Sequence, residues 1–272
     1  MSTVSVADIK KLREATGAGM TDCKTALVES DGDYDKALEF LRIKGLKGVA
    51  KREGRAASNG LVAAKLDGST KGVLLEINCE TDFVAKNPTF IALADSVVAA
   101  AQGASSPEEI LVDGKKLQDV IDEAGALLAE KIEVRRVASF EGAYVGLYLH
   151  KTSPDLPPQV GVLIELSAEN ADLAKDIAQH ITALPPLYVT RDEVPAELVE
   201  KEREIARATA IEEGKPEAAL DKITEGRVTG FFKDNVLIEQ SFAKDSKKTV
   251  GKVLDEAGVS VVRFARFKVG QA

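Results

Sequence analysis

Few residues of this chain have the type and spacing that catalysis requires. Of its two histidines, His150 ends an apolar segment and His180 lies on the apolar face of a predicted helix, where a hydrogen-bonded core histidine is the simpler interpretation. Glu76 and Glu165 occupy matching positions in two similar apolar segments, and paired carboxylates can perform general acid and base chemistry. Placement on the solvent-facing side of two strands explains the match more simply, so we expect neither glutamate to be catalytic.

Sequence motifs for nucleotide binding, hydrolysis and metal binding are also missing. The sequence has no G-x-S-x-G, no G-x-x-x-x-G-K-[ST] and no G-x-G-x-x-G that opens a helix after a strand. Gly17, Ala18 and Gly19 follow a helical pattern and indicate a helix end. Cys23 and Cys79 lack C-x-x-C spacing, so we expect buried, reduced thiols. We therefore predict a binding protein without an active site, metal or cofactor, rather than an enzyme.

The strongest candidate for a binding site is the segment 81–86, which contains Phe83. It follows an apolar run, residues 72–77, that has the length and composition of a buried strand, and an Asn-Pro pair then prevents a helix from running back through it. Phe83 should thus lie on a surface connector, either folded back onto its own core, as base rates favour, or presented to a partner. The matching connector at 167–170 has no aromatic residue, which shifts the balance toward a partner.

Composition limits the kind of partner and the compartment. The 272 residues suffice for more than one core, and the net charge of -8 argues against a mainly electrostatic contact with nucleic acid. We expect a protein partner, with no direct nucleic-acid partner and no membrane partner. The N-terminal residues have neither signal-peptide nor transit-peptide character, and no apolar run approaches membrane-spanning length, so we expect a cytoplasmic protein.

The first 55 residues predict a bundle of three short helices, capped by Ser5, Thr21 and Asp33. A core this small is weakly stable alone, so the bundle should be tethered to a larger body and act as a binding module. A basic stretch follows, and we interpret it as a solvated linker; an RNA-binding arm would need aromatic residues that are absent. The stretch comprises Lys44, Lys47, Lys51, Arg52 and Arg55.

The rest of the chain contains an internal repeat, because the run at 72–77 recurs at 161–166 almost letter for letter. Each copy is preceded by another predicted strand and followed by a predicted helix, which indicates two related antiparallel units of an α+β fold. The predicted units are a helical domain with its basic linker, residues 1–55; a core N-subdomain, residues 56–140; and a core C-subdomain, residues 141–272, interrupted by a helical hairpin at 190–230.

The predicted hairpin has a narrow apolar stripe, typical of a protruding antiparallel helix pair. Its first helix should run to residue 213 and its second to about residue 227. The stripe comprises Leu198, Ile205, Leu220 and Ile223. Residues 236–238 then predict a strand, residues 249–257 a helix, and residues 259–269 the strand that closes the second sheet.

Several separated segments resemble one family, bacterial elongation factor Ts. They are residues 11–13 with 17–24, 78–86, 132–136, 225–227 and 266–270, in chain order. The resemblance implies a guanine-nucleotide exchange factor for elongation factor Tu, with an N-terminal three-helix domain similar to ubiquitin-associated domains, a two-part core and the hairpin as a coiled-coil insertion. It also implies a possible homodimer or 2:2 complex through the hairpin.

The resemblance carries partner-binding roles to particular positions. Arg13, Met20 and Lys24 would contact the GTPase domain of the partner. Thr81, Asp82, Phe83 and Val84 would form the tip of the core, with Phe83 inserted near the magnesium and phosphate site of the partner. Val160, Gly161 and His180 would be further contact positions, and Ala243 with Lys244 would touch another domain of the partner.

Overall fold

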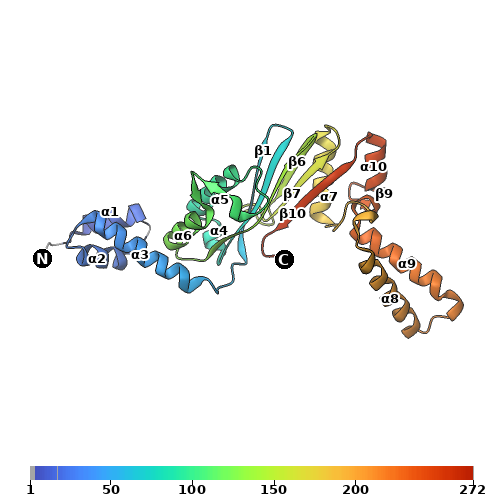
Figure 1. The fold of residues 1–272 in the computed structure, drawn as a ribbon, viewed down its shortest axis with the longest axis horizontal. Helices are drawn as coiled ribbons and strands as arrows, with labels where there is room; N and C mark the ends of the chain where they lie inside the picture. Colours follow the sequence, from blue (N-terminus) through green and yellow to red (C-terminus); the bar gives the residue numbers. More distant parts are fainter. Residues whose placement is uncertain (1–3, 17, 272) are drawn as a thin grey trace.

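The computed structural model describes residues 4–16 and 18–271. They form an elongated molecule with the N-terminal helices at one end and a long helix pair at the other (Figure 1). Between these ends, two three-stranded antiparallel sheets lie face to face, and helices cover the outer face of each. The predicted mixture of helices and antiparallel sheets is confirmed.

The N-terminal bundle consists of three helices, α1 (Val6–Thr16), α2 (Met20–Glu29) and α3 (Tyr34–Arg52). They pack around a small apolar core that includes Leu12, Cys23 and Leu27. Asp33 caps α3 as predicted, because its carboxylate accepts hydrogen bonds from the backbone N–H groups of Asp35 and Lys36. Gly17, part of the predicted helix end, lies outside the described residues.

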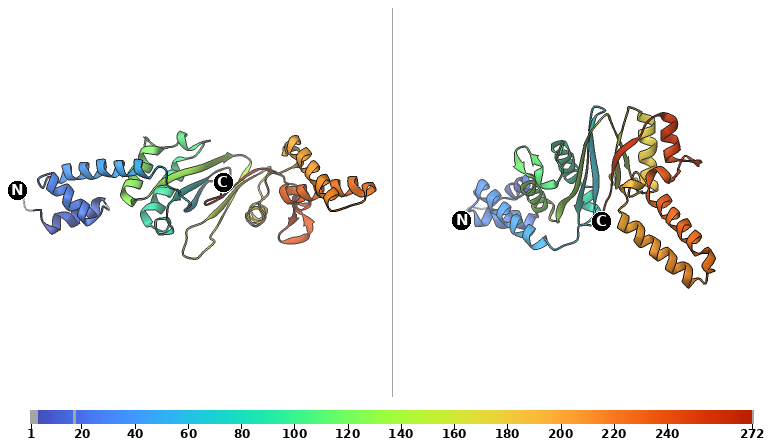
Figure 2. Two further views of the ribbon diagram at one scale, coloured as in Figure 1. Left: turned by 90° about the horizontal axis from the view of Figure 1, so that it is seen from below. Right: turned by 45° about the vertical axis from the view of Figure 1, so that its right-hand side comes forward.

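The prediction of a solvated linker after residue 43 is wrong, because α3 continues through it (Figure 2). The helix persists because it packs against α6 (Leu117–Leu128) of the core. A Cβ added at Gly45 would lie 2.6 Å from the Ala126 Cβ, so glycine permits the close approach. Arg42 forms an ion pair of 2.6 Å with Glu123, and the Arg52 guanidinium donates to the Gly125 carbonyl at 3.2 Å.

The first sheet has the strand order β1-β2-β5, with β2 paired to both neighbours in antiparallel register. Helices α4, α5 and α6 cover one of its faces and share an apolar core with it, centred on the fully buried Phe90. The elements of this half are β1 (Asn59–Asp67), β2 (Lys71–Cys79), α4 (Asp82–Ala85), α5 (Pro88–Ala100), the 3-10 helix η1 (Pro107–Glu109), β3 (Leu111–Val112), β4 (Lys115–Lys116), α6 and β5 (Ile132–Glu141).

The second sheet repeats this arrangement with the order β10-β7-β6. Helices α7 and α10 cover its outer face; Thr249 caps the N-terminus of α10 and Gly258 its C-terminus, close to the helix predicted at 249–257. The elements of this half are β6 (Tyr144–His150), β7 (Val160–Leu166), α7 (Ala171–Ala183), the 3-10 helices η2 (Arg191–Glu193) and η3 (Leu237–Glu239), α8 (Ala196–Glu212), α9 (Glu217–Asn235), β8 (Ser241–Phe242), β9 (Asp245–Thr249), α10 (Val250–Ala257) and β10 (Val261–Lys268).

The prediction that Glu76 and Glu165 face solvent is wrong. Glu76 is 0% exposed and Glu165 is 8% exposed, because helices cover one face of the central strands β2 and β7 and the opposite sheet covers the other. Each carboxylate pairs with an arginine of the neighbouring strand. Arg136 donates from Nε to Glu76 at 2.8 Å and also bonds it through Nη2, and Arg263 donates to Glu165 at 2.6 Å.

The two ion pairs connect the sheets reciprocally. The Arg136 guanidinium lies 4.7 Å from the centre of the Phe267 ring, on the opposite sheet, and the Arg263 guanidinium lies 4.3 Å from the centre of the Phe140 ring. Each arginine also donates to a backbone carbonyl of the opposite sheet, at 3.2 and 3.4 Å. We name these sets the first clamp (Glu76, Arg136, Phe267) and the second clamp (Glu165, Arg263, Phe140). The two clamps occupy equivalent places in the two copies of the sequence repeat.

Helices α8 and α9 form an antiparallel pair that projects from the second sheet (Figure 1). Ion pairs join Arg203 to Glu225 at 2.7 Å and Arg227 to Glu213 at 2.7 Å. The buried side chains of these two helices are Ala206, Ala210, Leu220, Thr224, Val228 and Phe232. Ile205, predicted on the apolar stripe, is instead 49% exposed, because small alanines occupy the seam.

The predicted strand at 236–238 is also wrong, since α9 extends to Asn235 and a 3-10 turn follows. Val236 makes only an isolated bridge with Tyr188, so no neighbouring strand extends the pairing. Its burial with Val194, Val228 and Phe232 explains the apolar run that suggested a strand.

Candidate functional site

Residues 81–86 form a single short helical turn, α4, directly after β2. The Thr81 hydroxyl accepts a hydrogen bond from the Val84 backbone N–H at 3.3 Å and so caps this turn. Val84 and Ala85 point into the core of the first sheet, whereas Phe83 is 78% exposed. The interpretation that Phe83 folds back onto its own core is therefore wrong.

Phe83 has one described aromatic or cationic contact, with Lys86. The Lys86 ammonium lies 5.2 Å from the centre of the Phe83 ring and forms an ion pair of 2.8 Å with Asp82. The hydrogen bond from Lys86 lowers the pKa of the Asp82 carboxyl. The turn therefore presents an apolar ring between an acidic and a basic group, which suits a protein surface that is itself partly apolar and partly charged.

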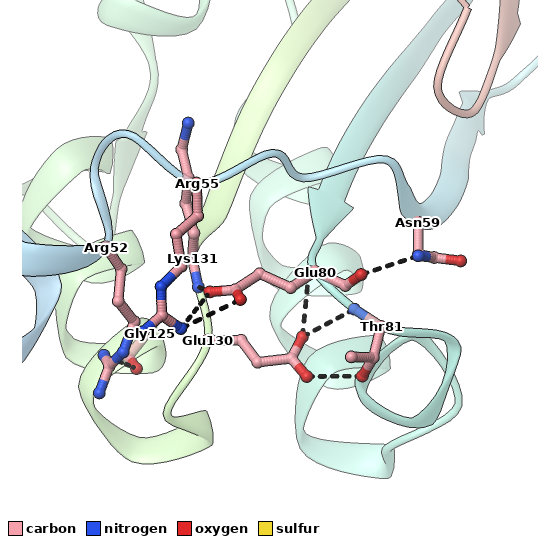
Figure 3. Close-up of polar contacts among 8 residues, drawn as sticks. All are labelled: Arg52, Arg55, Asn59, Glu80, Thr81, Gly125, Glu130 and Lys131. Carbon is pink, nitrogen blue, oxygen red and sulfur yellow. Dashed lines mark hydrogen bonds and ion pairs between the residues drawn. The ribbon is translucent and has the colours of Figure 1, made fainter.

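A polar cluster holds the start of this turn (Figure 3). The Glu130 carboxylate accepts hydrogen bonds from the backbone N–H groups of Glu80 and Thr81, both at 3.0 Å, and from the Thr81 hydroxyl at 2.5 Å. In return, the Glu80 carboxylate accepts from the Lys131 N–H at 2.7 Å and from the Arg55 guanidinium at 3.1 Å. Burial alone would raise the pKa of Glu80, but these donors outweigh it and lower the pKa.

Cys79 ends β2 directly before this cluster. Burial, together with the nearby charge of Glu130, raises the pKa of the Cys79 thiol to about 12. A thiol with such a pKa stays protonated, and Cys79 donates to the Thr81 carbonyl at 3.2 Å. Both cysteines are free and buried, as predicted.

Comparison with known proteins places this arrangement in a family. A family model described as "Elongation factor TS" matches residues 80–271. The chain is 60% identical over 276 residues to "Elongation factor Ts" of Acidothermus cellulolyticus and 58% identical over 279 residues to that of Thermobifida fusca, with 100% of each chain covered. It is 58% identical to "Elongation factor Ts" of Streptomyces griseus, over 99% of this chain and 100% of the relative.

The chain belongs to the elongation factor Ts family. The matched region begins within the polar cluster, at Glu80, and continues through the Phe83 turn and past β10 to residue 271. The full-length relatives also cover the N-terminal bundle.

The N-terminal positions implied by the resemblance lie on the surface of this elongation factor Ts. Arg13, Met20 and Lys24 are all exposed, Arg13 on α1 and the other two on α2. Met20, at 40% exposure, offers apolar area, and Lys24 lies one helical turn further along α2. The combination suits a surface with apolar and acidic groups.

Three further implied contact positions, Val160, Gly161 and His180, are buried. Val160 and Gly161 are buried in β7, and a Cβ added at Gly161 would lie 2.6 Å from Val62, so Gly161 faces the opposite sheet. His180 lies under the β8–β9 turn. Its side chain is 1% exposed, so it is not available for direct contact with a partner.

His180 supports the turn that carries Ala243 and Lys244. Its Nε2 lies 2.8 Å from Gln240 Oε1, and its Nδ1 accepts a hydrogen bond from the Ala243 N–H at 3.1 Å. Lys244 reaches back to form an ion pair with Asp176 on α7. The interpretation of His180 as a hydrogen-bonded core histidine is confirmed.

His180 gives this protein an expected pH dependence of stability. Burial lowers the pKa of His180 below its ordinary value of 6.5, against the effect of the Gln240 hydrogen bond. The unfolded chain therefore binds a proton that the folded chain does not, and stability should fall as pH drops from 7 through the unfolded pKa toward the folded one. We expect a His180→Gln variant to be less stable at pH 7 but to lose less stability on acidification. Thermal unfolding between pH 7 and about pH 5 measures both; equal pH slopes for the two proteins would contradict this assignment.

The sequence does not predict the supporting roles of Glu80 and Glu130. Their contacts join positions 49 to 51 residues apart in the chain, and neither lies in a motif that marks a carboxylate as structural. Within residues 4–16 and 18–271, no group of three or more His, Cys, Asp or Glu side chains is arranged to hold a metal ion. The helices of that part are also too short or too polar to cross a membrane.

Proposed function

We propose that this elongation factor Ts is a guanine-nucleotide exchange factor that binds elongation factor Tu in its GDP form and promotes GDP release, so that GTP can bind. The observation that carries the proposal is Phe83, a large aromatic ring 78% exposed on a turn fixed by the cluster of Figure 3. Thr81, Asp82 and Val84 complete the tip. The exchange activity comes from binding alone and requires no catalytic residue in this chain.

Linkage gives the physical basis of exchange. A protein that binds the nucleotide-free GTPase more tightly than the GDP-bound form must weaken GDP binding by the same factor. Burial of one phenylalanine ring contributes about 1.5 to 3 kcal/mol. If the ring occupies space that is open only when the partner has left its magnesium-bound geometry, the free energy of ring burial weakens GDP binding to the partner, in addition to strengthening the binding of this protein.

The remaining surfaces would hold the partner while Phe83 acts. Arg13, Met20 and Lys24 of the ubiquitin-associated-like bundle would contact the GTPase domain, and the turn with Ala243 and Lys244 would contact another domain. Such simultaneous contacts raise the effective concentration of the Phe83 turn at its target. Because α3 packs directly on α6, the bundle is held against the same half of the core that carries Phe83.

The structure favours this function over an RNA-binding arm. In the basic stretch, Arg52 is engaged by the Gly125 carbonyl and Arg55 by Glu80, so both guanidinium groups serve contacts within the protein. The side chains of Lys47 and Lys51 lie outside the described residues. Self-association through α8 and α9 stays a prediction; Ile205 and Ile211 are exposed there.

Release of fluorescently labelled GDP from elongation factor Tu tests the proposal. The loaded partner is mixed with excess unlabelled GDP, with and without this protein. We expect release to accelerate with increasing concentration of the protein, and substoichiometric amounts to suffice because the factor is regenerated. An unchanged release rate across the concentration series would refute the exchange function.

A further inference from the structure

Glu130 is connected to the Phe83 turn more directly than any other carboxylate of the cluster in Figure 3. It lies between α6 and β5, after Ala129, whose positive φ of 60° ends the helix. One carboxylate oxygen receives the N–H groups of Glu80 and Thr81, and the other receives the Thr81 hydroxyl. The side chain is half-buried, so these bonds are only partly shared with water.

These bonds satisfy groups that the sheet leaves unpaired. The β2–β5 ladder ends with the pair Cys79 and Ile132, so the N–H groups of Glu80 and Thr81 have no strand partner. An unpaired N–H at a partly buried site would be costly, and it would let the chain between β2 and α4 move. Glu130 supplies the missing acceptor at the point where the chain leaves the sheet.

Glu130 also sets the direction of the Thr81 cap. The Thr81 hydroxyl has one proton, and it donates that proton to Glu130, which leaves its lone pairs free for the Val84 N–H. A continuous series of hydrogen bonds thus runs from Glu130 through Thr81 to Val84, the residue after Phe83. The orientation of the first turn of α4 depends on the carboxylate.

The N-terminal bundle is attached to the same cluster. Arg55, three residues after the end of α3, forms an ion pair with Glu80, and Arg52 bonds to Gly125 of α6, the helix that ends just before Glu130. Glu80 in turn accepts from Lys131. The cluster therefore joins three parts of the chain: the end of α3, the Phe83 turn and the start of β5.

We propose that Glu130 is a positioning residue for nucleotide exchange, which holds the Thr81–Val84 turn so that Phe83 is presented in its binding geometry before the partner arrives. The inference rests on the proposed exchange function and adds a role for a residue outside the contact surface. A preorganised turn loses less conformational entropy on binding, so more of the ring's binding free energy remains available for coupling. Glu130 itself need not touch the partner.

Kinetics of GDP release with Glu130→Ala test the inference. We expect the maximal release rate to fall about tenfold, because a small displacement of the Phe83 ring weakens an effect that depends on its exact position. The protein concentration at half-maximal rate should change little, because the exposed surface of the N-terminal bundle is intact. Glu130→Gln, which keeps the shape and an acceptor oxygen, should lie between the wild type and Glu130→Ala. Glu133→Ala is the matched control, since Glu133 forms a surface ion pair with Lys131 and should behave as wild type.

A double variant separates positioning from other roles. If Glu130 acts through Phe83, adding Glu130→Ala to Phe83→Ala should lower the rate little further, whereas independent effects would multiply. Hydrogen–deuterium exchange of residues 80–86 in the free protein should increase in Glu130→Ala and remain at the wild-type level in Glu133→Ala.

The outcomes are distinguishable. If the wild-type protein does not accelerate GDP release, the proposed exchange function is wrong and the positioning role fails with it. If the wild type accelerates release and Glu130→Ala and Glu130→Gln do so equally well, only the positioning role is overturned. Multiplicative losses in the double variant, or unchanged hydrogen exchange at residues 80–86, would also overturn it.

Discussion

Phe83→Ala should reduce the stimulated rate of GDP release from elongation factor Tu by about 10- to 150-fold, the range that corresponds to about 1.5 to 3 kcal/mol of lost burial. The melting temperature should stay within about 2 °C of wild type, because truncation of a ring that is 78% exposed removes little from the folded core. The measurement pairs stopped-flow release of labelled GDP with thermal unfolding of the same preparations.

Leu111→Ala is the matched control for this experiment. Leu111 lies in the same half of the core, on β3, and is 56% exposed, but it is not part of the Phe83 turn or its polar cluster. We expect its release kinetics to match those of the wild type. If Phe83→Ala accelerates GDP release as well as the wild type, Phe83 has no role in exchange. If that variant instead loses much of its stability, the ring packs on its own core.

Local sequence patterns were sufficient to predict most of the elements that position the site. The repeat at 72–77 and 161–166 predicts both central strands, the Asp33 cap predicts the start of α3, and the helix predicted at 249–257 matches α10. The wrong prediction for Glu76 and Glu165 has a single cause. Both central strands are buried on their two faces, so the alternation that separates a core face from a solvent face is absent, and the pattern wrongly predicts that the two glutamates face solvent.

Contacts distant in the chain could not be predicted in the same way. Glu130 reaches Thr81 across 49 residues and Arg136 reaches Glu76 across 60, and no local spacing relates such partners. The helical continuation of α3 depends on α6, more than 60 residues later, because Gly45 allows the two helices to approach closely. The local sequence does not decide the exposure of Phe83 either, since nothing near it in the chain shows whether the core has room for its ring.

The first clamp should contribute more to stability than any other ion pair of the core. Among residues 4–16 and 18–271, Arg136→Met leaves the Glu76 carboxylate, 0% exposed, with only the Asn78 amide and the Gly270 N–H as donors. A buried charge that loses its partner costs about 3 to 5 kcal/mol, and we expect about 3 kcal/mol here because those two donors remain. The free energy of unfolding from urea titrations, followed by far-ultraviolet circular dichroism, measures the loss.

The internal repeat supplies the matched comparison. Arg263→Met removes the equivalent residue of the second clamp, but the Arg263 side chain is 48% exposed and that of Glu165 is 10% exposed, so water can reach the carboxylate and the loss should be nearer 1 kcal/mol. Glu76→Gln added to Arg136→Met should recover at least part of the stability, because a neutral amide keeps an acceptor for Asn78 and Gly270 without an unpaired charge. Equal losses in the two single variants, with no recovery in the double variant, would show that stacking on Phe267 and Phe140, rather than neutralisation of a buried carboxylate, makes the larger contribution to holding the sheets together.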